Sequence, residues 1–222
     1  MFRITPAIAT AALTAMTTLC AFPARAEVEF SVYGGYQTAP HSTLTIRGDD
    51  VLPDQDVHAG WDGDSFAMPP YYGIRGTWWQ SDTLGFGLEL NHAKVYADDV
   101  TLAATGFERL EMSDGINILT ANAFRRFPGA FGSLTPYVGA GVGISVPHIE
   151  LFDEGTRTFE YQFGGPAVAL MAGASYAIDE TWSVFGEYKI TYSQNELELD
   201  TGGTLETDIV TNALNFGVSY TF

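Results

Sequence analysis

Histidine and carboxylate side chains are the groups in this sequence best suited to proton transfer or metal binding. The histidines are His41, His58, His92 and His148, and acidic residues such as Asp98 gather in the same stretches. Imidazole and carboxylate ligands together bind divalent and redox metals. The spacing forms no compact ligand motif, so a solvated acidic surface bridged by calcium or magnesium is the alternative interpretation.

Several other reaction classes lack their sequence motifs. No GxGxxG follows a strand into a helix, so flavin and nicotinamide binding of the Rossmann type are not expected. No Gly-x-Ser-x-Gly nucleophile elbow and no haem motif are present. Nucleic acid is disfavoured as a partner because the net charge is -17 and no basic run offsets it.

Residues 1–26 have the composition of a cleaved export signal. Arg3 supplies a positive charge, residues 8–22 are almost entirely apolar or small, and residues 24–26 (ARA) form an A-x-A cleavage site. A membrane anchor is the alternative, although the apolar run is short and interrupted by threonine. Cleavage would leave a single domain, residues 27–222, without the only cysteine, Cys20. Disulfides and thiol catalysis are therefore not expected.

From residue 27 onward, apolar and small polar residues alternate with a period of two, as in residues 208–222. Eight such segments are predicted strands: 27–37, 69–80, 83–96, 112–126, 133–147, 165–178, 181–193 and 208–222. Short and long connections alternate, and the short ones all fall at one end. This pattern predicts an all-β fold, an eight-stranded antiparallel transmembrane β-barrel of the outer-membrane type, with short periplasmic turns and long extracellular loops.

The apolar face of each strand should meet the bilayer, and the small polar face should fill the lumen. Aromatic residues near strand ends fit the two membrane interfaces. Phe222 resembles the C-terminal signature of barrels delivered by the outer-membrane assembly machinery. A secreted lipocalin-like barrel, with the apolar face inside, is the alternative fold.

Parity also predicts the lumen side chains, which are Glu29, Arg75, Glu89, Asn117, Glu187, Lys189 and Asn215. Opposite charges in a narrow lumen should pair, because an isolated buried charge is costly. We therefore expect a network of Arg75, Glu89, Glu187 and Lys189, with a proton relay or pore constriction as the alternative. A break in parity after Ile118 predicts a bulge near Thr120.

Segments at the predicted outer rim combine polar and aromatic residues: 36–42 (YQTAPHS), 65–73 (SFAMPPYYG), 92–99 (HAKVYADD) and 106–110 (GFERL). Through these segments, and through residues 182–188 (WSVFGEY) and 211–215 (TNALN), the sequence resembles the lipid A oxidases of alphaproteobacterial outer membranes. The resemblance spans most of residues 27–222. It implies a location in the bacterial outer membrane and an oxygen-dependent oxidation of the proximal glucosamine of lipid A to 2-aminogluconate, with peroxide as by-product.

Oxidation of a sugar by dioxygen needs an electron conduit, and a chain without flavin or haem motifs would need a metal ion. Under the resemblance, our hypothesis places His41, His92 and Asp98 around a divalent or redox metal.

The remaining assignments concern lipid A, or lipopolysaccharide, as substrate. Lys94 and Arg109 would contact lipid phosphate beside Tyr96, and Glu111 would act as a base together with His92. His92 and Lys94 share the parity of lipid-facing residues such as Leu88, so both should meet headgroups at the rim. The alternative function is a non-enzymatic small outer-membrane barrel for adhesion or membrane integrity. A narrow porin is disfavoured because eight strands close on their own side chains.

Overall fold

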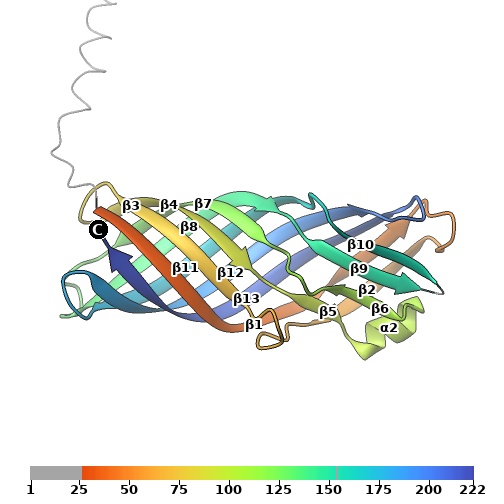
Figure 1. The fold of residues 1–222 in the computed structure, drawn as a ribbon, viewed down its shortest axis with the longest axis horizontal. Coiled ribbons are helices and arrows are strands. Elements are labelled where there is room, and N and C mark those ends of the chain that lie inside the picture. Colours follow the sequence, from red (N-terminus) through yellow and green to blue (C-terminus); the bar gives the residue numbers. More distant parts are fainter. Residues whose placement is uncertain (1–26, 154) are drawn as a thin grey trace, which may run out of the picture.

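The computed structural model describes residues 27–222 except residue 154. The predicted export signal, residues 1–26, lies outside the described residues. The strands form one long barrel, with the C-terminus at the end of the short turns and a helix and extra strands at the opposite end (Figure 1).

The barrel wall consists of β1 (Glu27–Arg47), β3 (Tyr72–Trp79), β4 (Leu84–His92), β7 (Ile118–Arg126), β8 (Leu134–Ser145), β11 (Gly165–Ala177), β12 (Trp182–Glu198) and β13 (Thr204–Thr221). Neighbouring strands pair antiparallel, and β1 pairs with both β13 and β3, which closes the barrel. The predicted antiparallel barrel of 8 strands is therefore confirmed.

The remaining elements form an outer lobe beyond the membrane-spanning wall: β2 (Gln55–Asp62), β5 (Val95–Ala97), α2 (Asp99–Thr105), β6 (Arg109–Met112), β9 (His148–Asp153) and β10 (Thr156–Tyr161). The lobe strands continue the sheet from β1 in the order β2-β5-β6-β9-β10. No helix among the residues that the structure describes is long and apolar enough to cross a membrane.

The predicted long connections at the outer end fold into this lobe. The stretches 38–68, 97–111 and 148–164 contain β2, α2 and the β9–β10 hairpin. The predicted loop over residues 194–207 is largely an extension of β12 and β13, which pair up to Glu198 and Thr204. Strands continue there because the lobe supplies an apolar core that loops in water would lack.

Within the bilayer region, the wall is apolar outside and polar inside, as the alternation predicts. Leu88, Val142 and Phe216 are exposed large apolar residues, whereas Arg75 and Glu89 are buried. Two glycines let aromatic rings cross the narrow lumen: a Cβ on Gly73 would overlap the Tyr33 ring, and one on Gly217 would overlap the Phe185 ring. Large side chains therefore fill the lumen, as expected for 8 strands.

The hydrophobic pattern inverts where the strands leave the membrane. On β12, Lys189 faces inward near the middle of the strand, but Leu197 does so near its outer end. The outward residues change from Tyr188 to the exposed Glu196. The lobe core includes Leu44, Ile46, Met112, Ile149, Leu151, Leu197, Leu205 and Ile209. An apolar core with an acidic exterior is the pattern of a water-soluble domain, so the lobe projects into water.

Side chains cap two of the short turns. The Ser81 hydroxyl accepts hydrogen bonds from the Thr83 and Leu84 amides at 3.3 and 3.1 Å. The Asp179 carboxylate accepts them from the Thr181 and Trp182 amides at 2.8 and 2.7 Å. The bonds from Trp182 and Thr181 lower the pKa of Asp179, so this carboxylate is ionised at neutral pH.

The predicted bulge near Thr120 is wrong. β7 pairs with β4 and β8 without a register shift from Ile118 onward. The change of parity arises because the strand begins at Ile118, after a turn in which Gly115 has φ 100 and Asn117 has φ 46. The irregularity of the wall lies instead in β1, where the register shifts between Thr38 and Leu44.

Candidate functional site

A network of charged side chains fills the lumen and confirms the predicted pairing. Arg75 donates from Nε to Glu89 at 2.6 Å and from Nη2 to Glu187 at 2.8 Å. The Lys189 ammonium pairs with Glu89 and donates to the Tyr33 hydroxyl at 2.9 Å. Two cations thus balance two carboxylates, and all four charged residues are buried. The alternative role of this network as a proton relay stays a prediction.

Two residues expected in the lumen lie elsewhere or at its end. Asn117 belongs to the turn before β7 and contacts His92, so its assignment to the lumen is wrong. The extra residues of that turn displace it from the parity of the strand. Glu29 lines a cavity at the short-turn end.

The three predicted metal ligands do not assemble. His41 is exposed on β1, with its ring centroid 5.2 Å from that of His58. Asp98 is the N-cap of α2, accepting a hydrogen bond from the Thr101 amide at 2.7 Å. His92 is buried at the end of β4. Across residues 27–222 without 154, no group of three or more His, Cys, Asp or Glu side chains could hold a metal ion. The residues therefore do not fit the proposed metal.

His92 lies on the lipid-facing parity of β4, but other side chains cover it, leaving 4% exposed. Its ring stacks on Tyr72 with centroids 5.0 Å apart, and Nδ1 lies 2.9 Å from the Asn117 Oδ1. The Asn117 amide nitrogen donates to the carbonyls of Asp114, Gly115 and Val146. Oδ1 is therefore the acceptor, and Nδ1 of His92 carries the hydrogen. This leaves Nε2 as the basic nitrogen, buried and without a hydrogen-bond partner.

His148, on β9, lies on the other side of the same turn. Its Nδ1 is 3.7 Å from the Asp114 carboxylate. Its ring packs against Phe159 and Tyr161, with ring centroids 4.5 Å apart in both pairs. The His148 amide donates to the Gly115 carbonyl at 2.9 Å, while a Cβ on Gly115 would overlap the His92 ring. One turn therefore positions both histidines. We call Tyr72, His92, Asp114, Asn117, His148 and Tyr161 the rim site.

Three of the predicted site residues lie on one face of the lobe sheet, the face that also carries His148. Tyr96 pairs with Glu111, and Glu111 pairs with Glu150. Arg109 forms an ion pair with Glu150 at 3.3 Å and keeps 55% of its side chain exposed. The structure thus brings Tyr96, Arg109 and Glu111 into one surface above the rim site, which we call the lobe face.

The expected exposure of Lys94 is wrong. Its side chain is fully buried, and Nζ donates to the Ala67 carbonyl at 3.0 Å. The chain turns inward after His92 because the Gln37 side-chain amide bonds both the backbone amide and the carbonyl of Lys94. The ammonium group therefore does not face lipid headgroups.

The sequence alone assigns neither His148 nor Asp114 to a site. They are separated by the whole of β7 and β8 and meet because the amide of His148 bonds the turn at Gly115. No local spacing signals that contact.

The fold and this arrangement define a class of protein: a closed antiparallel barrel with an apolar exterior, a polar lumen and a lobe in water is an outer-membrane β-barrel. The chain belongs to the family "Outer membrane protein beta-barrel domain", whose model matches residues 8–222. The protein is accordingly placed in the bacterial outer membrane.

Solved structures of other small barrels are similar to the chain. Neisserial surface protein A has 14% identity and a TM-score of 0.46, covering 88% of this chain and 96% of that one. The outer membrane protein AlkL has 15% identity and a TM-score of 0.49, covering 91% and 92%. The N-terminal barrel of Pseudomonas aeruginosa OprF has 16% identity and a TM-score of 0.42, covering 90% and 99%. A search among curated proteins finds no match.

Proposed function

We propose that this barrel oxidises the proximal glucosamine of lipid A to 2-aminogluconate, with dioxygen as electron acceptor, at the rim site. The sequence resemblance to lipid A oxidases motivates the proposal. The observation that carries it is the position of His92, an imidazole on the lipid-facing side of the outer rim whose Nε2 is unpartnered.

The reaction requires a proximal sugar whose anomeric hydroxyl is free, and it removes two electrons from the anomeric carbon. The C–H and O–H bonds of the hemiacetal break, dioxygen takes two electrons and two protons to become hydrogen peroxide, and water opens the resulting lactone to the acid. A base that accepts the hydroxyl proton assists the first step. Nε2 of His92 is suited to that role, and because it is buried, the side chains that cover it must move to admit the sugar.

Electron transfer to dioxygen needs a redox group. Because the described side chains form no cluster that fits a metal ion, we assign the residues of the chain to binding and proton transfer alone.

The surroundings of His92 suit an amphipathic phosphorylated sugar. Around the same turn, the exposed rings of Phe159 and Tyr161 contact His148, and tyrosine is a residue enriched at membrane interfaces. On the lobe face, Arg109 and Arg157 both reach Glu150 and are each at least half exposed. Their exposed N–H groups are suitable donors to a lipid phosphate, while Glu150 and the neighbouring Glu111 balance their charge.

Mass spectrometry of lipid A tests the proposal. Cells that express the protein should carry lipid A whose proximal sugar has gained one oxygen atom, and cells without the gene should not. His92→Ala should abolish the gain, whereas His58→Ala, a change of an exposed histidine in the lobe, should preserve it. Both variants should keep the gel-mobility shift of a folded barrel. Full activity of a folded His92→Ala variant contradicts the assignment.

A structural barrel for adhesion or membrane integrity is the second candidate. This role is favoured by the separation of His41, His92 and Asp98, which leaves no metal site among the described residues for a redox reaction. The lobe also has an apolar core of its own, so its presence is explained by folding alone. Unchanged lipid A, together with increased detergent sensitivity of cells that lack the gene, would support this role.

A further inference from the structure

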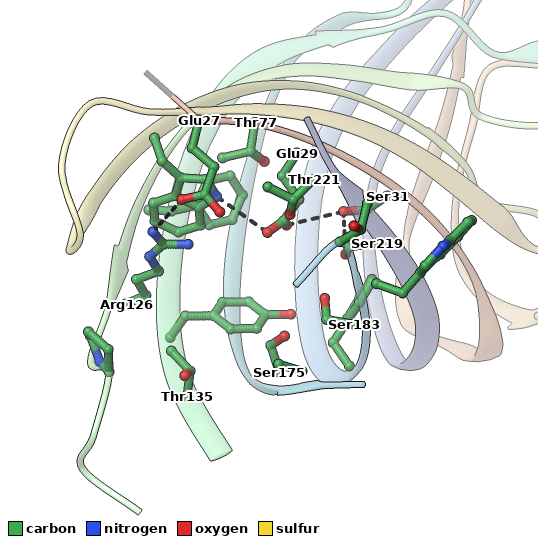
Figure 2. Close-up of a pocket in the computed structure, with 18 of the residues that line it drawn as sticks. Glu27, Glu29, Ser31, Thr77, Arg126, Thr135, Ser175, Ser183, Ser219 and Thr221 are labelled. Atoms are coloured by element: carbon green, nitrogen blue, oxygen red, sulfur yellow. Dashed lines mark hydrogen bonds and ion pairs between the residues drawn. The ribbon is translucent and has the colours of Figure 1, made fainter. Parts of the chain in front are cut away.

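Below the charged network, the lumen opens at the short-turn end into a cavity of about 350 Å³. Its innermost part is formed by Arg75, Phe124, Tyr137 and Phe185. Hydroxyl groups line its walls, as Figure 2 shows for Ser31, Thr77, Thr135, Ser175, Ser183, Ser219 and Thr221. A cavity of this volume is within the range of small-molecule sites.

The positive charges of the cavity are already compensated. Arg75 is bonded by Glu89 and Glu187. Arg126 forms an ion pair with Glu27 at 2.9 Å (Figure 2). Its guanidinium carbon lies 4.0 Å from the centroid of the Trp79 ring, which holds it against the wall. Among the described residues, neither guanidinium forms an ion pair with any other carboxylate of the cavity.

Glu29 is the carboxylate in the cavity wall that lacks such a partner. Its contacts are two long hydrogen bonds, from Trp79 Nε1 at 3.4 Å and from the Ser31 hydroxyl at 3.4 Å. The Ser31 hydroxyl in turn lies 2.8 Å from that of Ser219, so a chain of two hydroxyl groups extends from the carboxylate (Figure 2). No ion pair of the described chain includes Glu29. The charges of Arg126 and Arg75 reach Glu29 only at longer range. A half-buried carboxylate whose hydrogen-bond donors are all neutral favours a nearby cation.

The mouth of the cavity is acidic as well. Asp82, Asp179 and Glu180 line it without a basic partner among the described ion pairs. Their charges concentrate cations at the entrance.

We propose that this cavity binds a primary ammonium group carried by a small polar organic molecule or lysine side chain, with Glu29 as its counter-ion. An ammonium has three N–H donors, which match the Glu29 carboxylate and the hydroxyls of Ser31 and Ser219. An organic cation fits better than a metal ion, because the carboxylates of the described residues do not converge in threes. The site lies at the end of the barrel opposite the rim site and does not depend on the lipid A proposal.

Titration of the purified barrel in detergent micelles tests this site, with lysine blocked at both ends as the probe and blocked norleucine as its neutral analogue. Binding is followed by calorimetry and by NMR shifts of the cavity residues. Blocked lysine should bind at least tenfold more tightly than blocked norleucine. Glu29→Gln should weaken lysine binding at least tenfold, and Glu160→Gln, the same change on the outer lobe, should alter it less than twofold.

Three results would overturn the proposal: no binding of blocked lysine, equal binding of both probes, or unchanged binding to a folded Glu29→Gln variant. Displacement of the probe by stoichiometric magnesium would also overturn it, because the site would then belong to a metal ion. If Glu29→Gln fails to fold, Ser219→Ala serves instead and should weaken lysine binding several-fold without changing the response to norleucine.

Discussion

Replacing Arg75 by methionine tests whether charge pairing in the lumen is needed for the stability of the barrel. Arg75 is the only link from Glu187 to a cation among the ion pairs of the described residues, since Lys189 pairs with Glu89. Without Arg75, Glu187 keeps only neutral donors, the Tyr137 hydroxyl at 3.0 Å and the Asn215 amide at 3.2 Å.

Removing one partner of a buried ion pair costs about 3–5 kcal/mol, because the other charge stays buried without compensation. We expect Arg75→Met to lower the free energy of unfolding by about that amount, a large part of the ~5–15 kcal/mol typical of folded domains. The double variant Arg75→Met/Glu187→Gln removes both charges and should recover more than half of the loss.

Urea-induced unfolding in lipid vesicles, followed by tryptophan fluorescence and by gel mobility, measures these differences. Arg157→Met is the matched control, because its pair with Glu150 lies on the exposed lobe face and should contribute at most about 1 kcal/mol. If Arg75→Met lowers the free energy of unfolding no more than the control does, charge pairing in the lumen does not stabilise the barrel. A double variant as unstable as the single one would show the same.

Other predictions concern the lobe, the rim and assembly. Asp98→Ala should cost about 1 kcal/mol of local stability in α2, measured by amide exchange. Hydrogen bonds from Thr101 lower the pKa of Asp98 in the folded protein. The cap therefore stabilises α2 fully above the pKa of an unfolded aspartate, and this stabilisation is lost as the pH falls through the pKa of the folded state. Gly115→Ala should strain the turn by about 1–3 kcal/mol and reduce lipid A oxidation in a barrel that still folds, as mass spectrometry would reveal. A chain lacking Phe222 should assemble less efficiently in cells, measured as folded protein in outer-membrane fractions. Planar-bilayer recordings should show no stable conductance, because Arg75 and its partners fill the lumen.

The barrel itself could be predicted because alternation carries the information about which face meets lipid. A membrane-spanning strand must place apolar residues on one side and polar residues on the other, so parity alone located Arg75, Glu89, Glu187 and Lys189 in the lumen. The pairing of these four residues followed from the cost of isolated charges.

The strands of the lobe could not be predicted in the same way, because they place apolar residues inward and polar residues outward. Leu197 and Leu205 face inward and Glu196 and Glu206 outward, so the same alternation continues with its polarity exchanged. A prediction that treats acidic, turn-rich segments as loops ends the strands too early.

The candidate site could be predicted only in part. Tyr96, Arg109 and Glu111 do share a surface, since they are placed by the neighbouring strands β5 and β6. His41, His92 and Asp98 are separated because different local contacts position them. His41 lies on an exposed part of β1, His92 stacks on Tyr72, and Asp98 caps α2. Such requirements depend on tertiary contacts that spacing along the chain does not encode.

The uninterrupted ladder between β12 and β13 makes the lobe a fixed spacer. The two strands pair in one register from Trp182 and Tyr220 at the short-turn end to Glu198 and Thr204 at the outer end, with no hinge between membrane and water. Tyr192 is the last aromatic residue of β12 and marks the outer membrane interface. Six further residues of β12, at about 3.4 Å each along the strand, set the reach of the lobe. The lobe face therefore stays within about 20 Å of the membrane surface along the strand, which is the membrane-proximal layer of the cell surface.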